Sequence, residues 1–322
     1  MSQQTITYIV FGAALLLALI FDLGLLSKKN KEVTIKKAMQ QTIFWVVLAL
    51  AFFVFVWIED GKQPALEYIS AYLMEWSLSI DNIFVFILIF TSFAVKKAYY
   101  SRVLLIGILM AIVFRVIFIT VGVALVHKFE WILYIFGVFL LYTGYKMFVS
   151  KDDEQFNPET SKAYKFVRRI FPITMSDGGG KFSIIQNGKR VYTTLFIVVM
   201  MLASIDLVFA LDSIPAVMGI SRDKMVIYTS NIFAVLGLRS LFFLLRGAVN
   251  KFEYLQQGIA IVLIFIGLKM LAAKWFDEWF NTNIQIFISL GVIIVCITTS
   301  ILLSIAKNKR TAKLQSKNQH SL

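Results

Sequence analysis

The sequence has few of the residues on which disulfide scaffolds and soft-metal sites depend. It contains one cysteine, Cys296, and two histidines, His127 and His320, among 322 residues. A disulfide framework needs paired cysteines, and zinc or copper sites need several thiolate or imidazole ligands, so these classes are excluded. Charged residues make up only 16% of the chain and hydrophobic residues 59%, which disfavours an ordinary soluble domain. A membrane protein is the leading class.

Long apolar runs are what the sequence has in abundance. A helix needs roughly 20 apolar residues to cross about 30 Å of hydrocarbon. The runs are continuously apolar and lack the alternation of a lipid-facing barrel. We predict an all-α polytopic membrane protein, one transmembrane domain over residues 1–322, with about nine transmembrane helices at 5–26, 38–58, 65–94, 103–126, 131–149, 192–219, 226–245, 255–273 and 283–305.

The net charge of +13 is distributed as membrane topology requires. Basic residues near helix ends favour the cytoplasm. One side of the predicted bundle holds only Lys62, Lys128, Arg222, Lys224 and Lys274, while every turn on the other side is basic. We therefore expect a multi-pass protein of the inner membrane with its N-terminus outside and its C-terminus in the cytoplasm. No single stripe of basic and aromatic residues is present, so nucleic acid is not an expected partner; the lipid bilayer is.

The longest connection, residues 150–190, is polar and is expected in the cytoplasm. Residues 186–189 read QNGK between two apolar stretches, which predicts a β-hairpin with a type I′ turn. Residues 178–181 read GGGK, but the spacing is wrong for a P-loop and no Ser or Thr follows the lysine. We interpret this run as a flexible loop.

An internal repeat is visible in the charged residues of the spans. Residues 75–83 read EWSLSIDNI and residues 206–215 read DLVFALDSIP, each with a carboxylate, five residues, then Asp and a small polar residue. Arg115 and Arg239 lie centrally in the next spans, and GYKM and GLKM end the spans after those. Spans three to five (65–149) are therefore predicted to be duplicated in spans six to eight (192–273), with 5–26, 38–58 and 283–305 as extra helices. Each unit has three spans, an odd number, so the second unit starts from the opposite side of the membrane to the first. The repeat is therefore inverted, an architecture typical of secondary transporters.

The carboxylates inside the spans need compensation. Each ionised acid at a helix centre costs about 2.5–3.5 kcal/mol on insertion scales. All-oxygen ligation without His or Cys suits Mg, Ca or Mn more than Zn or Cu. The predicted metal ligands are Glu75, Asp81, Asn82, Asp206, Asp212 and Ser213. The alternative is an inert core in which one basic residue balances each acid, the candidates being Arg115, Lys146, Arg239 and Lys269.

Helix geometry adds a constraint on the paired acids. Six residues along an α-helix turn by about 600°, which leaves the two acids of each motif about 120° from a shared face. Pro215 removes the amide that would bond the Leu211 carbonyl, so we predict an interrupted helix at Asp212. Asn231 supplies an oxygen that suits a transport pathway, although a helix–helix hydrogen bond explains it equally well. Glu67 lies at the outer edge of span three and Asp22 near the inner surface, both in ordinary interfacial positions.

The motifs resemble those of the TerC and Alx integral membrane proteins, a family associated with tellurium resistance and metal-ion homeostasis. The most specific matches are EWSLSIDN at 75–82, FALDSIPA at 209–216 and SNIFAVLGLRS at 230–240, and the resemblance runs from residue 21 to residue 270. It implies a transporter of the lysine-exporter-like group, with manganese export as the activity of some members and the four acids as the metal site. Many relatives carry a glutamate where this chain has Ala203.

These observations favour a secondary transporter that exports a divalent cation, Mn²⁺ first and Ca²⁺ second, through a midplane site with alternating access. No resident cofactor is expected. The alternative is a membrane scaffold or insertion partner that acts through the 150–190 loop, with tellurite resistance as an indirect phenotype. No nucleophile with a base and no cofactor fingerprint is found, so the protein is not expected to be an enzyme.

Overall fold

The computed structural model describes residues 3–26, 33–129, 131–149, 162–246 and 254–319. Within these ranges the backbone of Asp22, Asp81 and Asp212 is described as helical, but their side chains are not described. The helices are α1 (Gln3–Leu26), α2 (Ile35–Glu59), α3 (Lys62–Ser92), η1 (Lys97–Tyr99), α4 (Tyr100–Lys128), α5 (Ile132–Val149), α6 (Lys162–Ile170), η3 (Gly178–Gly180), α7 (Thr194–Met218), α8 (Lys224–Leu245), α9 (Leu255–Leu271), α10 (Ala273–Trp279) and α11 (Thr282–Gln319). The strands are β1 (Ser183–Gln186) and β2 (Lys189–Tyr192).

The all-α class is confirmed, and each predicted span falls on a helix. Within the described residues, six segments are long and apolar enough to cross a membrane, namely 35–59, 97–126, 132–149, 194–218, 224–245 and 284–307. Residues 6–17 and 256–271 form shorter apolar helices, and α3 carries Glu67, Glu75 and Asp81 among its apolar residues. Nine crossings therefore stay a prediction.

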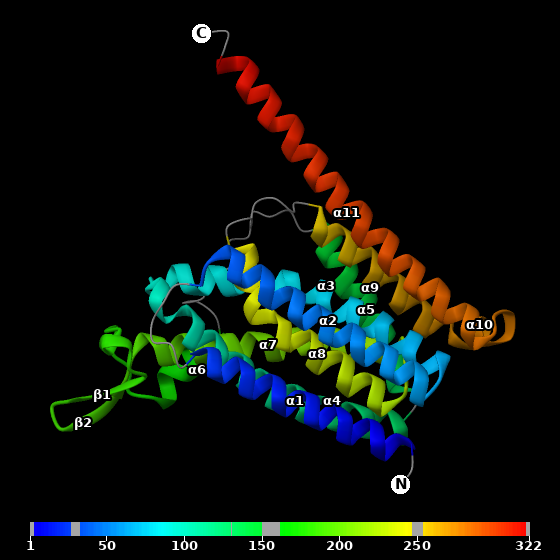
Figure 1. The fold of residues 1–322 in the computed structure, drawn as a ribbon, viewed down its shortest axis with the longest axis horizontal. Coiled ribbons are helices and arrows are strands. Elements are labelled where there is room, and N and C mark those ends of the chain that lie inside the picture. The colour runs from blue at the N-terminus through cyan, green and yellow to red at the C-terminus, as the bar shows by residue number, and fades with distance from the viewer. Residues whose placement is uncertain (1–2, 27–32, 130, 150–161, 247–253, 320–322) are drawn as a thin grey trace.

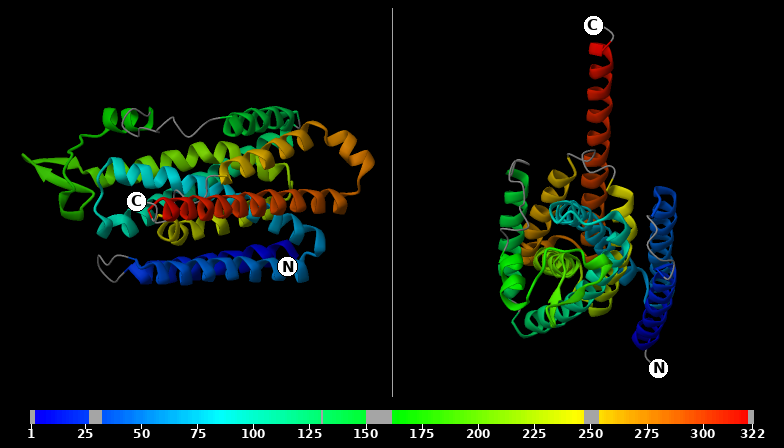
Figure 2. Two further views of the ribbon diagram at one scale, coloured as in Figure 1. Left: turned by 90° about the horizontal axis from the view of Figure 1, so that it is seen from above. Right: turned by 90° about the vertical axis from the view of Figure 1, so that its left-hand side faces the viewer.

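The helices form an elongated bundle with α8 in its interior (Figure 1). Nearly all of α8 is buried, because α2, α3 and α4 pack around it. Figure 2 shows α1 and α2 on one flank and α5 on the opposite flank, while the C-terminal part of α11 projects away from the bundle. Large apolar side chains on α2, α5 and α11 are exposed, which suits helices that face lipid tails.

Two ends of the bundle differ, and they are named here by what they carry. The hairpin end holds β1, β2 and α6, and the opposite end holds α10 (Figure 1). We call the second the cavity end, because a cavity lined in part by Ala273 and Phe276 of α10 opens there. The turns between α2 and α3, between α4 and α5 and between α7 and α8 all lie at the cavity end, because successive long helices run antiparallel.

Helices from the two predicted repeat units pack crosswise. The first helix of one unit, α3, packs mainly on α8, and its counterpart α7 packs mainly on α4. The third helices, α5 and α9, form the most extensive pair. This exchange of partners is what an inverted repeat predicts; the repeat itself stays a prediction.

Glycines bring the backbones of α5 and α9 together. A Cβ added at Gly144 would lie 2.9 Å from the Ala260 carbonyl oxygen, and one at Gly267 would lie 2.8 Å from the Gly137 carbonyl oxygen. Small residues at such positions let transmembrane helices approach closely and pack through their backbones. We call this contact the glycine seam.

The predicted hairpin is confirmed. Gln186 pairs with Lys189, and the two residues between them, Asn187 and Gly188, have φ angles of 51° and 73°. Positive φ at both central positions defines a type I′ turn.

The glycine run beside the hairpin was wrongly interpreted as a flexible loop. Gly178, Gly179 and Gly180 form the turn η3 with positive φ, and a Cβ at Gly180 would lie 2.6 Å from the ring of Tyr99. Arg102 at the start of α4 donates to the Gly180 carbonyl oxygen at 3.1 Å. Positive φ favours glycine at all three positions, and at Gly180 a side chain would also collide with the tyrosine.

An ion pair completes the docking of this segment. The Nζ of Lys96 lies 2.6 Å from Oδ2 of Asp177, and Asp177 also accepts from the Gly179 amide. The pKa of the Asp177 carboxyl is lowered, mainly by the hydrogen bond from Lys96 and secondly by the hydrogen bond from the Gly179 amide. The segment that leads into the hairpin is thereby fixed to the start of α4.

Candidate functional site

Arg115 of α4 lies at the centre of a polar cluster inside the bundle. Its side chain is 1% exposed, and it is the largest fully buried side chain in the described part of the protein. A charged group in this position is costly unless partners surround it. The apolar helices α3, α7 and α8 each supply a partner.

Asp206 of α7 receives a paired hydrogen bond from the arginine. Nε of Arg115 donates to Oδ2 at 2.8 Å and Nη2 donates to Oδ1 at 3.1 Å. The planar guanidinium matches the two oxygens of one carboxylate, which makes this geometry both strong and directional. Asp206 is itself 1% exposed.

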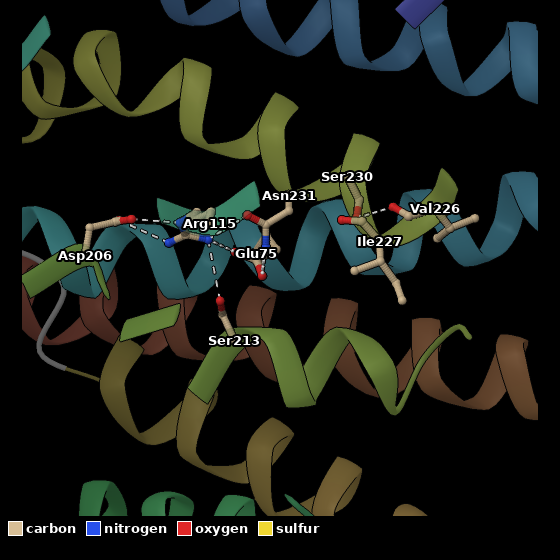
Figure 3. A network of polar contacts seen from close by, with 8 residues as sticks. All are labelled: Glu75, Arg115, Asp206, Ser213, Val226, Ile227, Ser230 and Asn231. Atoms are coloured by element: carbon tan, nitrogen blue, oxygen red, sulfur yellow. Dashed lines mark hydrogen bonds and ion pairs between the residues drawn. The ribbon is translucent and has the colours of Figure 1, made fainter. Parts of the chain in front are cut away.

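Glu75 of α3 and Asn231 of α8 close the other side of the cluster (Figure 3). Nη1 of Arg115 donates to Oε2 of Glu75 at 2.9 Å and to Oδ1 of Asn231 at 2.9 Å. The amide of Asn231 donates to Oε1 of Glu75 at 2.6 Å. Ser213 Oγ lies at 3.5 Å from Nη1, at the outer limit of a hydrogen bond. Asn231 therefore links the acid to the base.

The cluster holds fewer positive than negative charges among its described side chains. Two carboxylates, Glu75 and Asp206, share the single guanidinium of Arg115. Removing one partner from a buried pair costs about 3–5 kcal/mol, so the three charged groups depend on one another. With all three groups ionised, the described cluster carries a formal charge of −1.

The structure brings together five of the residues predicted from sequence, namely Glu75, Asp206, Ser213, Arg115 and Asn231. Asn82 lies on α3, the helix that carries Glu75, and is also buried. The side chains of Asp81 and Asp212 lie outside the described part of the protein, so their ligand roles stay predictions. Among the side chains that are described, no three His, Cys, Asp or Glu gather closely enough to hold a metal ion.

The other basic residues predicted to balance the acids lie at different places in the bundle. Lys146 is exposed in the last turn of α5, where its long side chain can reach the headgroups. Lys269 donates to Ser289 Oγ at 3.1 Å near the cavity end, and Arg239 is buried in α8. One basic residue for each acid is therefore not the pattern at this cluster, because Arg115 serves two acids.

The predicted interruption of the helix at Asp212 is wrong. α7 runs without a break from Thr194 to Met218, with Pro215 inside it. The proline lies one turn from the C-terminal end, so the helix loses a single amide bond and has little length left to kink. α3 is continuous through Asp81 as well.

A cavity of about 360 Å³ opens at the cavity end and was not foreseen. Glu67 is nine-tenths buried at its wall and accepts hydrogen bonds from Ser221 and Gln63. Lys269 and the exposed Arg222 also line it. Glu67 was noted in the sequence, and Gln63 lies four residues before it on α3, a spacing that a local pattern can identify. Ser221 lies 154 residues away, and no local pattern identifies it.

These features define a polytopic helical membrane protein with a charged cluster in its core. A family model described as the integral membrane protein TerC family matches residues 60–312, and the chain belongs to this family. The resemblance found in the motifs is thus confirmed.

Relatives extend over almost the whole chain. It is 40% identical over 299 residues to an uncharacterized membrane protein of Myxococcus xanthus, which covers 93% of this chain and 92% of the relative. It is 36% identical over 312 residues to a protein of Salmonella typhi named as a membrane-bound redox modulator, Alx, with 94% and 95% covered. The corresponding Escherichia coli protein is 35% identical over the same length. No solved structure matches the chain.

Proposed function

We propose that this protein is a secondary transporter that exports a divalent cation, with Mn²⁺ as the favoured substrate and Ca²⁺ as the second. The carrying observation is that Glu75 and Asp206, from the first helices of the two predicted repeat units, meet in one buried cluster with a single arginine. Alternating access between two such units is the expected mechanism.

Oxygen chemistry supports a hard cation. The described cluster offers carboxylate, amide and hydroxyl oxygens from Glu75, Asp206, Asn231 and Ser213. These are the ligand types that Mg²⁺, Ca²⁺ and Mn²⁺ accept. Asp81 and Asp212 lie six residues further along the same helices as Glu75 and Asp206, and we assign them to the site as additional ligands.

Electrostatics favours a cation over an oxyanion. Two unit charges 4 Å apart interact by about 4 kcal/mol at an effective dielectric constant of 20, and a divalent ion doubles this for each carboxylate. A tellurium oxyanion would meet repulsion from the same groups, so we place tellurium resistance downstream of metal handling. We assign the cavity at the α10 end to the outside, since the basic turns lie at the hairpin end.

The Salmonella typhi and Escherichia coli relatives are named as membrane-bound redox modulators. For this chain we expect any redox effect to follow from metal export, because one cysteine cannot form an internal disulfide.

The test is total cellular metal, measured by mass spectrometry in cells challenged with manganese. Cells carry an empty vector, the wild type, Asp212→Asn or Asp177→Asn at matched membrane levels. Asp177→Asn makes the same chemical change in the docked segment and serves as the control. We expect the wild type and the control to lower cellular manganese and Asp212→Asn to match the empty vector.

Two results would contradict the proposal. No change in any divalent metal with the wild type would remove the transport function. An active Asp212→Asn, together with loss of activity on deleting residues 183–192, would instead favour a scaffold that acts through the hairpin.

A further inference from the structure

Arg115 engages the same two acids that the proposed function assigns to the cation. Its guanidinium bonds both oxygens of Asp206 and Oε2 of Glu75, and Asn231 bonds Oε1 of Glu75. All four carboxylate oxygens therefore already accept a hydrogen bond from the protein. Each oxygen keeps a second lone-pair site, so a metal ion could bind these carboxylates either beside the guanidinium or in its place, and the positive charge of Arg115 opposes the ion in both cases.

We propose that Arg115 is a tethered counter-cation, which competes with the transported ion for Glu75 and Asp206 and takes its place when the ion leaves. The proposal rests on the transport function above and adds the residue that controls the site's affinity and its return step.

The chemistry of arginine suits this role. A guanidinium stays protonated inside proteins, so it cannot be removed from the carboxylates by losing a proton. It has to move instead, and its side chain has the rotatable bonds to do so. A divalent ion bound beside the guanidinium would repel it, so the two cations exclude each other from the same acids.

In a transport cycle, Arg115 would lower the affinity for the cation and ease the reorientation of the unloaded protein. Without Arg115, two carboxylates would have to change their exposure uncompensated in the interior of the membrane, which is costly. With Arg115 their charge is partly balanced after release, while each binding event has to overcome the repulsion between the ion and the guanidinium. A competitor built into the chain thus weakens binding and speeds the return of the unloaded protein.

The experiment uses the full chain reconstituted in liposomes, with three measurements on each variant. These are the dissociation constant for Mn²⁺, exchange of internal Mn²⁺ for tracer Mn²⁺, and net Mn²⁺ flux into metal-free buffer. For Arg115→Gln we expect about tenfold tighter binding and exchange within about threefold of wild type. Net flux should fall by about tenfold, because only net flux requires the unloaded protein to return.

Arg168→Gln is the matched control. Arg168 is exposed on α6, outside the polar cluster, so the same substitution there should leave all three measurements unchanged. Arg115→Lys keeps the charge but cannot bond both oxygens of Asp206 in parallel. It should bind Mn²⁺ about threefold more tightly than wild type and retain net flux. This variant decides the question if Arg115→Gln is not recovered in folded form by size-exclusion chromatography.

Two outcomes overturn the inference alone. In the first, the folded Arg115→Gln or Arg115→Lys variant binds Mn²⁺ no more tightly than an active wild type. In the second, exchange and net flux of Arg115→Gln fall in the same proportion. A wild type that neither binds nor moves Mn²⁺, Ca²⁺ or another divalent ion would overturn the proposed function and this inference with it.

Discussion

The polar cluster around Arg115 and the cavity at the α10 end both place an acid near a base, yet they hold their charges differently. In the cluster, Arg115, Glu75 and Asp206 are each 1% exposed and bond one another directly. At the cavity, the carboxylate of Glu67 accepts hydrogen bonds from two neutral side chains, those of Ser221 and Gln63. Where water is excluded a charge needs an opposite charge, whereas beside an open cavity neutral groups and solvent suffice.

The sharpest way to break this comparison is to measure water access directly. Cys296→Ser gives a cysteine-free chain, into which Arg222→Cys or Ser213→Cys is introduced. In lipid nanodiscs a membrane-impermeant thiol reagent should label position 222, which is exposed at the cavity, readily. Position 213, 2% exposed in the cluster, should label orders of magnitude more slowly, because the site must first open. Equal rates at the two positions would show that the cluster is wet.

Asparagine and glutamine side chains in the two regions give the second test. Asn231 is fully buried and bridges Glu75 and Arg115, so Asn231→Ala should lower the free energy of unfolding by about 1–3 kcal/mol. Gln63 is exposed and donates to Glu67 at 3.1 Å, so Gln63→Ala should cost no more than about 0.5 kcal/mol. Tryptophan fluorescence during unfolding in mixed micelles measures both. Similar losses would mean that burial does not separate the regions.

The smallest effect is expected at the ion pair between Lys96 and Asp177, where both side chains are partly exposed to water. Lys96 lowers the pKa of the Asp177 carboxyl below its ordinary 3.8. A lowered folded-state pKa stabilises docking above about pH 4, and this contribution is lost as the pH falls through the lowered value. Spin labels at Lys97→Cys and Ile185→Cys in the Cys296→Ser background report the distance by pulsed EPR. We expect the distribution to broaden between pH 7 and about pH 2.

Asp177→Asn is the control for that titration, since it removes the titrating group. Its distance distribution should be broad at both pH values. A wild-type distribution that stays narrow at the lowest pH would show that Arg102 and the glycine turn hold the segment without the ion pair.

Local chemistry in the sequence was sufficient for the helices and the hairpin. Continuous apolar runs predict helices because a membrane leaves the backbone no other partner. Asn187 and Gly188 predict their turn because few other residues adopt positive φ in succession. Docking of the glycine run could not be predicted, since Arg102 and Gly180 meet across 78 residues and nothing in either segment identifies the other.

The candidate site was predictable in its members but not in its pairing. Glu75, Asp206 and Arg115 stand out because charges in apolar runs need a reason. Which base meets which acid depends on how the helices face one another, and α5 is so uniformly apolar that its sequence does not indicate which side Lys146 occupies. Proline does not interrupt α7 at Asp212, because the effect of a proline depends on how much helix follows it and only Ala216, Val217 and Met218 follow Pro215.

The glycine seam constrains how such a bundle can change shape. Gly144 and Gly267 let α5 and α9 touch backbone to backbone, so neither helix can slide or rotate against the other without driving a carbonyl into a Cα. Because each helix ends one of the two predicted units, we expect the seam to stay fixed between them in the proposed transporter. The helices that carry Glu75, Arg115 and Asp206 would then tilt about a fixed axis, and a small rotation there would become a larger displacement at the two faces of the membrane.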